Sequence, residues 1–286
     1  MAVVNTNVNA SVAQNALVRN ERSMNTAMER LSTGQRINSA SDDAAGLAIS
    51  SRMTSQIRGL ETAVRNANDG ISMIQTADGA LIEVGNMLQR MRELALQASN
   101  GTTTSADRDY LNTEYQNLIG EIERIATNTQ WNGGAVLNGT ASSVAFQVGA
   151  NGGQTVSVNF GNFIASGTIF SAMKVANSGN GHSLSSTTTT AALTTASGAI
   201  TVIDSAITSV NSQRATFGAA MNQLSYAVDN LSNVKVNSEA ARSRIADTDY
   251  ANETSELART QIIQQAGTAM LAQANQLPQT VLALLR

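Results

Sequence analysis

Apolar residues recur every three or four positions along most of this 286-residue chain, a spacing that is typical of helices burying one face. The longest series alternates spacings of three and four almost without interruption, and it predicts a coiled-coil seam of about six heptads. Its members are Ile57, Leu60, Val64, Ala67, Ile71, Ile74, Ala77, Leu81, Val84, Leu88, Met91, Ala95 and Ala98. Asn100-Gly101 ends the series, and Thr104 followed by Asp107 resembles the capping box of a following, shorter helix.

Both ends of the chain carry apolar residues spaced by seven, which predicts a helix at each end. The N-terminal series is Val3, Ala10, Leu17, Met24 and Leu31, and the C-terminal series is Ile263, Met270, Leu277 and Leu284. Gly34 is expected to cap the first helix at its C-terminus, and Ser41 or Asp42 to begin the long helix. A second long helix is predicted from Ile200, Ile203, Ile207, Val210, Phe217, Met221, Leu224, Val228, Leu231 and Ile245.

The middle of the chain changes to a period of two. SVAFQV and TVSVNF flank the turn sequence ANGG, so a β-hairpin is predicted over about Ser143–Phe160, preceded by Asn-Gly turns in WNGGAVLNG. Residues 176–195 show no period and much Ser, Thr and Gly, which predicts an exposed loop. The predicted fold class is therefore mainly α: a long antiparallel helical coiled-coil bundle with a small β-hairpin region in the middle.

Composition narrows the function classes. Only 3% of residues are aromatic and 14% are charged, and the net charge of −3 offers no electrostatic footprint for nucleic acid. There is no cysteine, so neither a disulfide nor a thiolate metal site can form. No apolar run is long enough to span a membrane. The first residues lack the features of a secretory signal, so we expect any export to use another route.

No set of residues with catalytic or metal-binding chemistry emerges from the sequence. His182, the only histidine, lies in the Gly/Ser-rich loop and is read as a bystander rather than a ligand. Asp42-Asp43 is read as a helix cap, because negative charge is favoured in a first turn. The glycosylation sequons at Asn138 and Asn230 are expected by chance in so Asn- and Thr-rich a chain. We therefore expect neither an enzyme nor a cofactor.

Three stretches carry a resemblance to a known family, the bacterial flagellins. QNALVRNERSMNTAMERLSTGQRINSASDDAAGLAIS resembles their N-terminal signature, and LQRMRELALQASNGT with DRDYLNTEYQNLIGEIERIATNTQWNG resembles their core. RIADTDYANETSELARTQIIQQAGTAMLAQANQLPQTVLALLR is similar to their C-terminus, so the resemblance covers about residues 1–140 and 196–286. It implies a short flagellin with a reduced outer region, a structural subunit that polymerises into the flagellar filament.

The resemblance also implies a division of the chain. Paired terminal helices would line the inner tube of the filament, and the long helices would form the next layer outward. The expected segments are a terminal helix at 1–43, core helices at 44–140, a hairpin region at 141–175, a variable loop at 176–195, a long core helix at 196–246 and a terminal helix at 247–286.

Partners follow from the same resemblance. The chain would be held by an export chaperone and then exported unfolded through the flagellar type III pathway, without a cleaved signal peptide. It would be assembled outside the cell at the filament tip, alongside cap and hook-junction proteins. Flagellins of many bacteria are detected by an innate immune receptor of the Toll-like type. The matching contact positions here are Arg90, Leu94 and Glu114. Leu94 falls outside the predicted seam and is expected to be an exposed binding anchor.

The C-terminal sequence LPQTVLALLR is unusually apolar for a chain end. Its large apolar residues are predicted to act in assembly: Leu277, Val281, Leu282, Leu284 and Leu285. Because short isolated helices are marginal in water, we expect residues 1–40 and 250–286 to be disordered in the monomer and to become helical when neighbouring copies cover them.

Two alternatives remain open at this stage. A hook–filament junction protein shares flagellin-like ends, although such proteins depart further from the long-helix motifs. A cytoplasmic coiled-coil signalling protein belongs to a different class, and it would need neither the central hairpin nor seams at both termini.

Overall fold

The computed structural model describes residues 7–164, 184 and 189–284, and of residues 189–193 and 277–284 it describes the backbone only. The described chain is mainly helical, as predicted. Its helices are α1 (Val8–Thr33), α2 (Ala44–Ala98), α3 (Ser105–Asn128), α5 (Thr189–Ala246) and α6 (Tyr250–Leu284). Its strands are β1 (Gln130–Trp131), β2 (Gly134–Ala135), β3 (Val144–Gln147) and β4 (Thr155–Val158). Two compact units divide the chain, residues 58–235 and residues 1–57 with 236–286.

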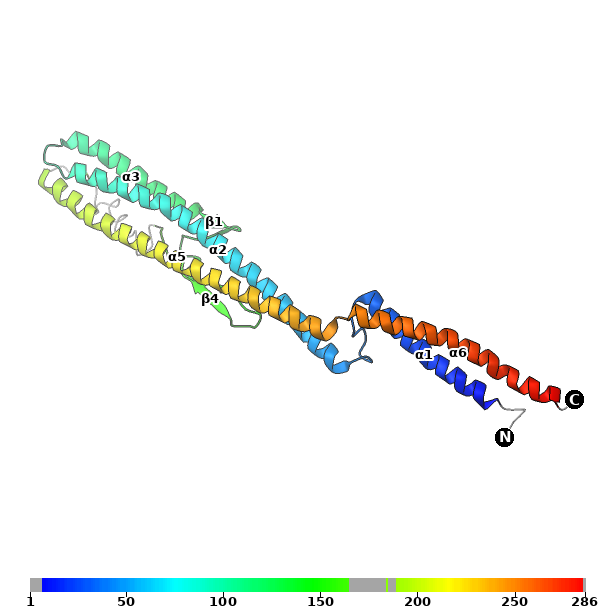
Figure 1. Cartoon of the computed structure of the whole chain (residues 1–286). Helices are drawn as coiled ribbons and strands as arrows, with labels where there is room; N and C mark the ends of the chain where they lie inside the picture. Colours follow the sequence, from blue (N-terminus) through cyan, green and yellow to red (C-terminus); the bar gives the residue numbers. More distant parts are fainter. Residues whose placement is uncertain (1–6, 165–183, 185–188, 285–286) are drawn as a thin grey trace. The chain divides into compact units, whose positions relative to one another are not determined.

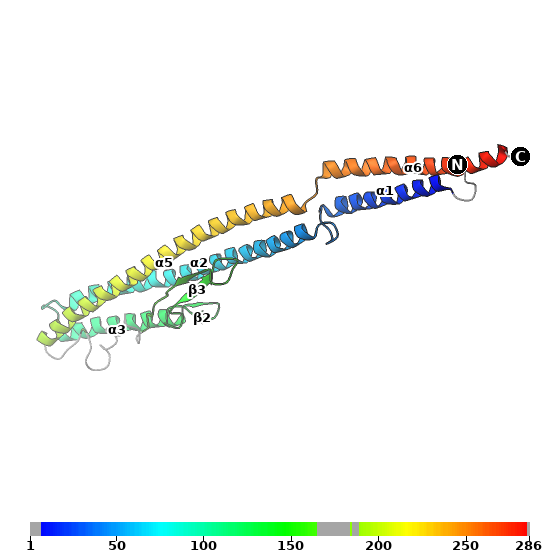
Figure 2. The ribbon, with the colours of Figure 1, turned by 90° about the horizontal axis from the view of Figure 1, so that it is seen from below.

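In the unit of residues 58–235, α2, α3 and α5 lie side by side (Figures 1 and 2). The long apolar seam predicted for α2 is confirmed, since all of its members except Val64 and Ile71 are buried. Ile203, Val210, Phe217 and Leu224 of α5 are buried in the same core. Salt bridges then join α2 to α5 in antiparallel order: Glu61 to Lys235, Asp78 to Arg214 and Arg92 to Asp204.

The turn between α2 and α3 is closed by side chains. Thr104 and Asp107 form the predicted capping box at the start of α3. The buried guanidinium of Arg108 donates to the carbonyl oxygens of Ala98 and Asn100, at 3.0 and 3.2 Å. Because the last carbonyls of a helix lack intrahelical partners and carry partial negative charge, this cation completes the end of α2.

The predicted hairpin is also confirmed. β3 and β4 pair antiparallel with Val144 opposite Val158, and β1 and β2 form a second small ladder. The turn of the second ladder is Asn132-Gly133, both at positive φ as a two-residue hairpin turn requires. The longer hairpin lies on α2 at Gly70, where an added Cβ would come within 2.9 Å of the Phe146 ring.

The loop predicted over 176–195 differs at its C-terminal end, because α5 already begins at Thr189. Leu184 is fully buried, and its backbone N–H donates to Asn112 Oδ1 at 3.1 Å. A Ser/Thr-rich run hides a helix start because its polar side chains weaken the apolar signal. His182 and the remaining residues of this loop lie outside the described part of the chain.

In the second unit, α1 ends as predicted, with Gly34 in the left-handed conformation and its N–H bonded to Arg30 O. The expected cap of α2 was misplaced by one or two residues, because Asp43 Oδ1 accepts from Gly46 N–H at 2.8 Å. Asp42 instead closes the preceding turn by accepting from the N–H groups of residues 38 and 39. These hydrogen bonds hold the pKa of the Asp42 carboxyl below its ordinary value.

Candidate functional site

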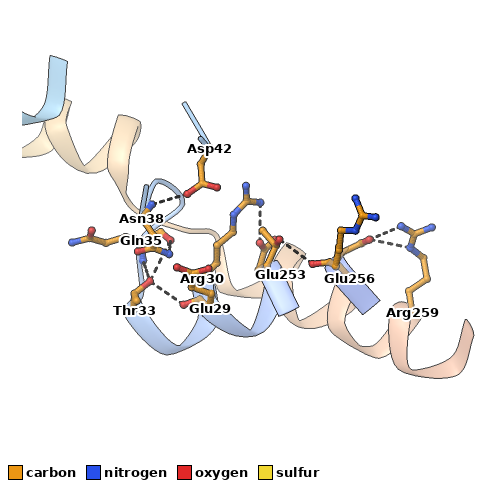
Figure 3. A network of polar contacts seen from close by, with 11 residues as sticks. Glu29, Arg30, Thr33, Gln35, Asn38, Asp42, Glu253, Glu256 and Arg259 are labelled. Atoms are coloured by element: carbon orange, nitrogen blue, oxygen red, sulfur yellow. Dashed lines mark hydrogen bonds and ion pairs between the residues drawn. The ribbon is translucent and has the colours of Figure 1, made fainter. Parts of the chain in front are cut away.

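The two terminal segments are helices that lie side by side, α1 against α6 (Figures 1 and 2). Arg30 pairs with Glu253 at 3.0 Å, and Asn20 Nδ2 donates to Thr260 O at 2.8 Å. Residue numbers rise along α1 as they fall along α6, so the pair is antiparallel. Figure 3 shows the Arg30–Glu253 contact with the polar residues around it.

The face of α6 toward α1 is built from small and polar residues as much as from apolar ones. Its less exposed positions repeat at heptad spacing: Leu257, Thr260, Gln264, Gly267, Leu271 and Ala274. Gly267 lets α1 approach closely, since a Cβ added there would lie 2.5 Å from Leu17 Cδ2. On α1 the predicted seam positions Ala10, Leu17, Met24 and Leu31 are all partly covered.

The helix predicted from the C-terminal apolar series is confirmed by α6. Ile263 is 42% exposed and Met270 is 66% exposed, so this series does not face α1. Two series spaced by seven face α1, one through Gln264 and Leu271 and one through Thr260 and Gly267, and the series of Ile263 and Met270 runs beside them. Small side chains allow the closer approach there, which leaves the bulkier series outside.

The outer surface of the terminal pair is consequently apolar in many places. On α6, Ile262 is 66% exposed beside Ile263 and Met270. On α1, Val8, Val12, Val18 and Met28 are exposed as well. Single exposed apolar side chains are normal on a protein surface, but a group of them on one pair of helices makes this surface a candidate site of contact.

The apolar tail LPQTVLALLR follows these residues in the sequence. The backbone of α6 runs to Leu284 and so includes four of the predicted assembly residues, Leu277, Val281, Leu282 and Leu284. Their side chains, and Leu285 altogether, lie outside the described residues. Their part in assembly therefore stays a prediction.

The expected receptor residues lie on α2 and α3. Arg90 Nε donates to Glu114 Oε1 at 2.9 Å, and Arg90 Nη1 donates to Glu93 Oε2 at 3.0 Å. The hydrogen bonds with Glu114 and then with Glu93 raise the pKa of the Arg90 guanidinium. The Arg90 and Glu114 side chains are about half exposed, and the Glu93 side chain is 68% exposed. The two ion pairs hold a charged cluster at the surface where α2 and α3 meet.

Leu94 does not join that surface, and the expectation that it is an exposed anchor was wrong. It is 1% exposed and belongs to the hydrophobic core with Met91 and Ala95. α2 packs between α3 and α5, so it buries a face wider than a two-stranded seam, and Leu94 falls inside that face. Leu96, which the sequence did not single out, is the exposed leucine here.

The described residues were also compared with what a metal site, a membrane span or a ligand pocket requires. Among them, no three His, Asp or Glu side chains come together as a metal-binding group. No described helix is long and apolar enough to cross a membrane. A hollow beside the tip of the longer hairpin is lined mainly by amides and small residues, including Asn66, Gln147 and Ala150.

Comparisons with known proteins cover nearly the whole chain. Residues 4–142 match the family model of the bacterial flagellin N-terminal helical region, and residues 200–285 match that of the C-terminal helical region. A flagellin of Halalkalibacterium halodurans is 45% identical over 286 residues, covering 99% of this chain and all of that protein. A flagellin of Xenorhabdus nematophila is 42% identical, covering 100% of this chain and 99% of that protein.

Among solved structures, the crystal structure of Bacillus cereus flagellin is 34% identical, covers 58% of this chain and 88% of that chain, and has a TM-score of 0.45. The sequence matches extend over both ends and the core, and they favour a flagellin over the junction-protein and signalling alternatives. Flagellins are structural proteins and not enzymes. The chain belongs to the bacterial flagellin family and is a structural subunit of the flagellar filament.

Proposed function

We propose that the outer apolar face of the α1–α6 pair, continued by the tail at residues 277–285, is the surface on which neighbouring copies assemble. The observation that carries this proposal is the exposure of Ile262, Ile263 and Met270 on a helix whose other side already packs on α1. In a filament these side chains become buried between copies. Burying one such side chain contributes about 2 kcal/mol.

The same arrangement supports the expectation that the ends are disordered in the free monomer. Thr260 is the only described residue of α6 that is fully buried, and Ala27 is the only one of α1. A pair with so small a core gains little from packing, whereas ordering each residue costs backbone entropy. Strong amide protection of residues 250–286 in dilute monomer, measured by hydrogen exchange, would contradict this expectation.

Serine substitutions on the outer face test the assembly proposal. Ile262→Ser and Met270→Ser should each raise the critical concentration for polymerisation by about 30-fold, the equivalent of about 2 kcal/mol. Gln261→Ser is the matched control, because it changes an exposed polar neighbour on the same helix. Sedimentation of filaments measures the effect. Polymerisation of both variants at the wild-type critical concentration would refute the proposal.

A second pair of substitutions tests the tail. Leu282→Ser combined with Leu285→Ser should abolish polymerisation, because the tail would lose apolar surface that another copy covers. The thermal melt of the unit of residues 58–235 should barely change, since the tail belongs to the other unit. A lower melting temperature of that unit would instead show that the tail stabilises the monomer.

We also propose a route by which the chain leaves the cell. An unfolded chain has to pass through a narrow channel, and a sequence without cysteine cannot form disulfides that would block its passage. We expect the chain to leave through the flagellar type III pathway, with a chaperone holding the apolar C-terminal segment beforehand. Leu282→Ser with Leu285→Ser should then also weaken chaperone binding, which titration calorimetry with the purified chaperone would measure.

A second candidate function is recognition by a Toll-like innate immune receptor. The exposed Arg90–Glu114 pair favours it, because a half-exposed guanidinium flanked by two carboxylates can exchange its partners for those of another protein. Arg90→Ala should weaken receptor signalling by soluble monomer and also reduce motility, if filament contacts share this face. Arg92→Ala is the matched control, because Arg92 is equally exposed but pairs with Asp204 on α5. Equal signalling by the two variants would refute a role for Arg90.

A further inference from the structure

The C-terminal helix α6 contains the only proline of the chain, Pro278, near its C-terminal end. In an α-helix, each backbone N–H donates to the carbonyl oxygen four residues earlier. Proline has no N–H, so Ala274 O lacks the donor that the helix would otherwise give it. The backbone nevertheless stays helical on both sides of Pro278, up to Leu284. Completing the helix at this point therefore calls for a donor from elsewhere.

The start of α1 provides such a donor. Asn7 Nδ2 donates to Ala274 O at 2.8 Å, so this hydrogen bond reaches the same carbonyl that Pro278 leaves without its intrahelical partner. Asn7 and Ala274 are both partly covered. A carbonyl in such a place is costly to leave without a donor. The contact therefore completes the backbone hydrogen bonding of α6 where the sequence of α6 cannot.

The other end of the Asn7 amide acts on α1 itself. Asn7 is the N-cap of α1, and its Oδ1 accepts from the backbone N–H of Ala10 at 3.1 Å. Asn, Asp, Ser and Thr all cap helices well, but an ionised Asp has no proton to donate, and Ser and Thr carry donor and acceptor on a single oxygen. Asparagine alone among them holds an acceptor and a donor on separate atoms. One side chain thus begins α1 and completes α6.

This contact differs from the other polar contacts of the terminal pair. Asn20 Nδ2 also donates to a backbone carbonyl, Thr260 O, but that oxygen lies four residues before a backbone N–H of the same helix. The two helices are aligned near their other ends, by backbone hydrogen bonds between residues 34–36 and residues 246–248. The particular contribution of Asn7 is therefore not alignment but the donor that proline removes.

We propose that Asn7 couples the order of the two chain ends, because its amide supplies the hydrogen bond that Pro278 removes from α6. Residues 279–284, beyond the proline, are too few to form a stable helix in water by themselves. Their helical state then depends on the start of α1 being in place. This inference rests on the proposed assembly role of the tail. Asn7 is a positioning residue, since it acts on assembly through the helix that carries the tail.

The coupling matters for a subunit that adds to a growing filament. A chain whose α1 has not yet formed lacks the donor for Ala274 O, so its tail is less ordered. Such a tail offers neighbouring copies a less well-defined apolar surface, and ordering it on contact costs backbone entropy. Copies with both ends already paired are therefore favoured at the step of addition.

Two substitutions separate the cap from the donor. Asn7→Ser keeps an oxygen that caps α1, but its side chain is shorter and lacks the amide donor. Pro278→Ala restores a backbone N–H, so Ala274 O regains an intrahelical partner. Each variant is isotope-labelled and co-assembled as a minor component with wild-type chain, so that filaments form in every case. Hydrogen exchange with mass spectrometry then reports the protection of the amides of residues 279–284 in the labelled molecules.

Asn7→Ser should speed the exchange of these amides by about tenfold, as expected for a covered carbonyl without a donor. Asn9→Ser is the matched control, because Asn9 is exposed in the first turn of the same helix, and it should leave exchange unchanged. In the Pro278→Ala chain, Asn7→Ser should change exchange by less than about twofold, the limit expected for independent sites.

A role of Asn7 as a cap alone would speed exchange equally with and without Pro278, and that result would overturn the proposal. Unchanged exchange in Asn7→Ser would overturn it as well. Exclusion of Asn7→Ser from the mixed filaments, with inclusion of Asn9→Ser and of the Asn7→Ser, Pro278→Ala double variant, would support the coupling.

The critical concentration for polymerisation separates this inference from the assembly proposal. It should rise about tenfold in Asn7→Ser, and it should be nearly the same in Pro278→Ala with and without Asn7→Ser. If exchange rises in Asn7→Ser while the critical concentration stays at the wild-type value, the coupling holds and the assembly role of the tail fails. The assembly role of the outer face fails separately, if Ile262→Ser and Met270→Ser polymerise like the wild type.

Discussion

Truncation of Leu94 distinguishes a core residue from a receptor anchor. The side chain is 1% exposed and packs in the core of the unit of residues 58–235. Leu94→Ala removes buried apolar volume, and such changes cost about 3 kcal/mol in unfolding free energy. For a unit of this size, each kcal/mol lowers the melting temperature by roughly 2–4 °C, so we expect a drop of about 6–12 °C.

Circular dichroism of soluble monomer measures this melting temperature, and receptor binding is measured well below it. Leu96→Ala is the matched control, because Leu96 is exposed two positions along the same helix, and its truncation should cost less than about 0.5 kcal/mol. Arg90→Ala should also leave the melt nearly unchanged, since exposed ion pairs contribute about 0–1 kcal/mol.

We expect Leu94→Ala to weaken receptor binding only through loss of folded protein or movement of the Arg90 and Glu114 side chains. The reasoning would be refuted if Leu94→Ala melted like the wild type and still lost receptor binding. Leu94 would then be an exposed contact residue, as its place outside the sequence seam first suggested.

Other predictions concern packing and ionisation in the same unit. Gly70→Ala should destabilise the unit of residues 58–235 by about 1 kcal/mol, because the clash with Phe146 outweighs the gain in helix propensity. Gly79 has open space around it, so Gly79→Ala should stabilise the unit by about 0.5–1 kcal/mol. Denaturant unfolding of the two variants measures both effects. Burial raises the pKa of Tyr115 to about 12, so the unfolded chain releases the phenol proton at a lower pH than the folded chain does. The free energy of unfolding should therefore fall by about 3 kcal/mol between about pH 10 and pH 12. Tyr115→Phe should not show this fall. Leu184→Ala should cost about 2–5 kcal/mol in thermal or chemical unfolding, whereas a side chain in an exposed loop would cost almost nothing.

The burial of Leu184 also changes the expectation for the loop over 176–195. A surface loop tolerates deletion at small entropic cost, so an exposed loop over 176–195 could be removed with the fold intact. The deletion would in fact remove a buried leucine and the first turns of α5. Deleting 176–195 should therefore reduce the stability of the unit, and helical circular dichroism during thermal unfolding would show the loss.

Much of the fold could be predicted because local sequence signals coincide with the packing. The α2 seam, the cap at Gly34, the Thr104–Asp107 box and the hairpin each rest on spacing or turn chemistry within a few residues. The start of α5 could not be predicted in this way. Its first turns are rich in threonine and alanine, and only the burial of Ala196 and Ala199 against the core reveals a helix there.

The burial of Leu94 and the exposure of Ile263 have a common physical cause, which is the number of helices that pack on α2 and on α6. Heptad spacing identifies a narrow stripe, but a helix with two neighbours buries a wider face. α2 has α3 on one side and α5 on the other, so both Leu94 and Ala95 become buried. α6 has α1 alone alongside it among the described residues of its unit, so the heptad series of Ile263 and Met270 remains exposed.

The exposed apolar residues of α6 call for a physical explanation. α1 covers the side that contains Gly267, where the two backbones approach closely, while Ile262, Ile263 and Met270 remain exposed. Apolar side chains that no helix of the same chain covers contribute little to folding the monomer, and they make it prone to associate. In a filament subunit such residues are favourable only if other copies bury them. We therefore expect contacts in the filament to bury the apolar surface of α6 that α1 leaves uncovered, so Met270→Ser should impair polymerisation while sparing the fold.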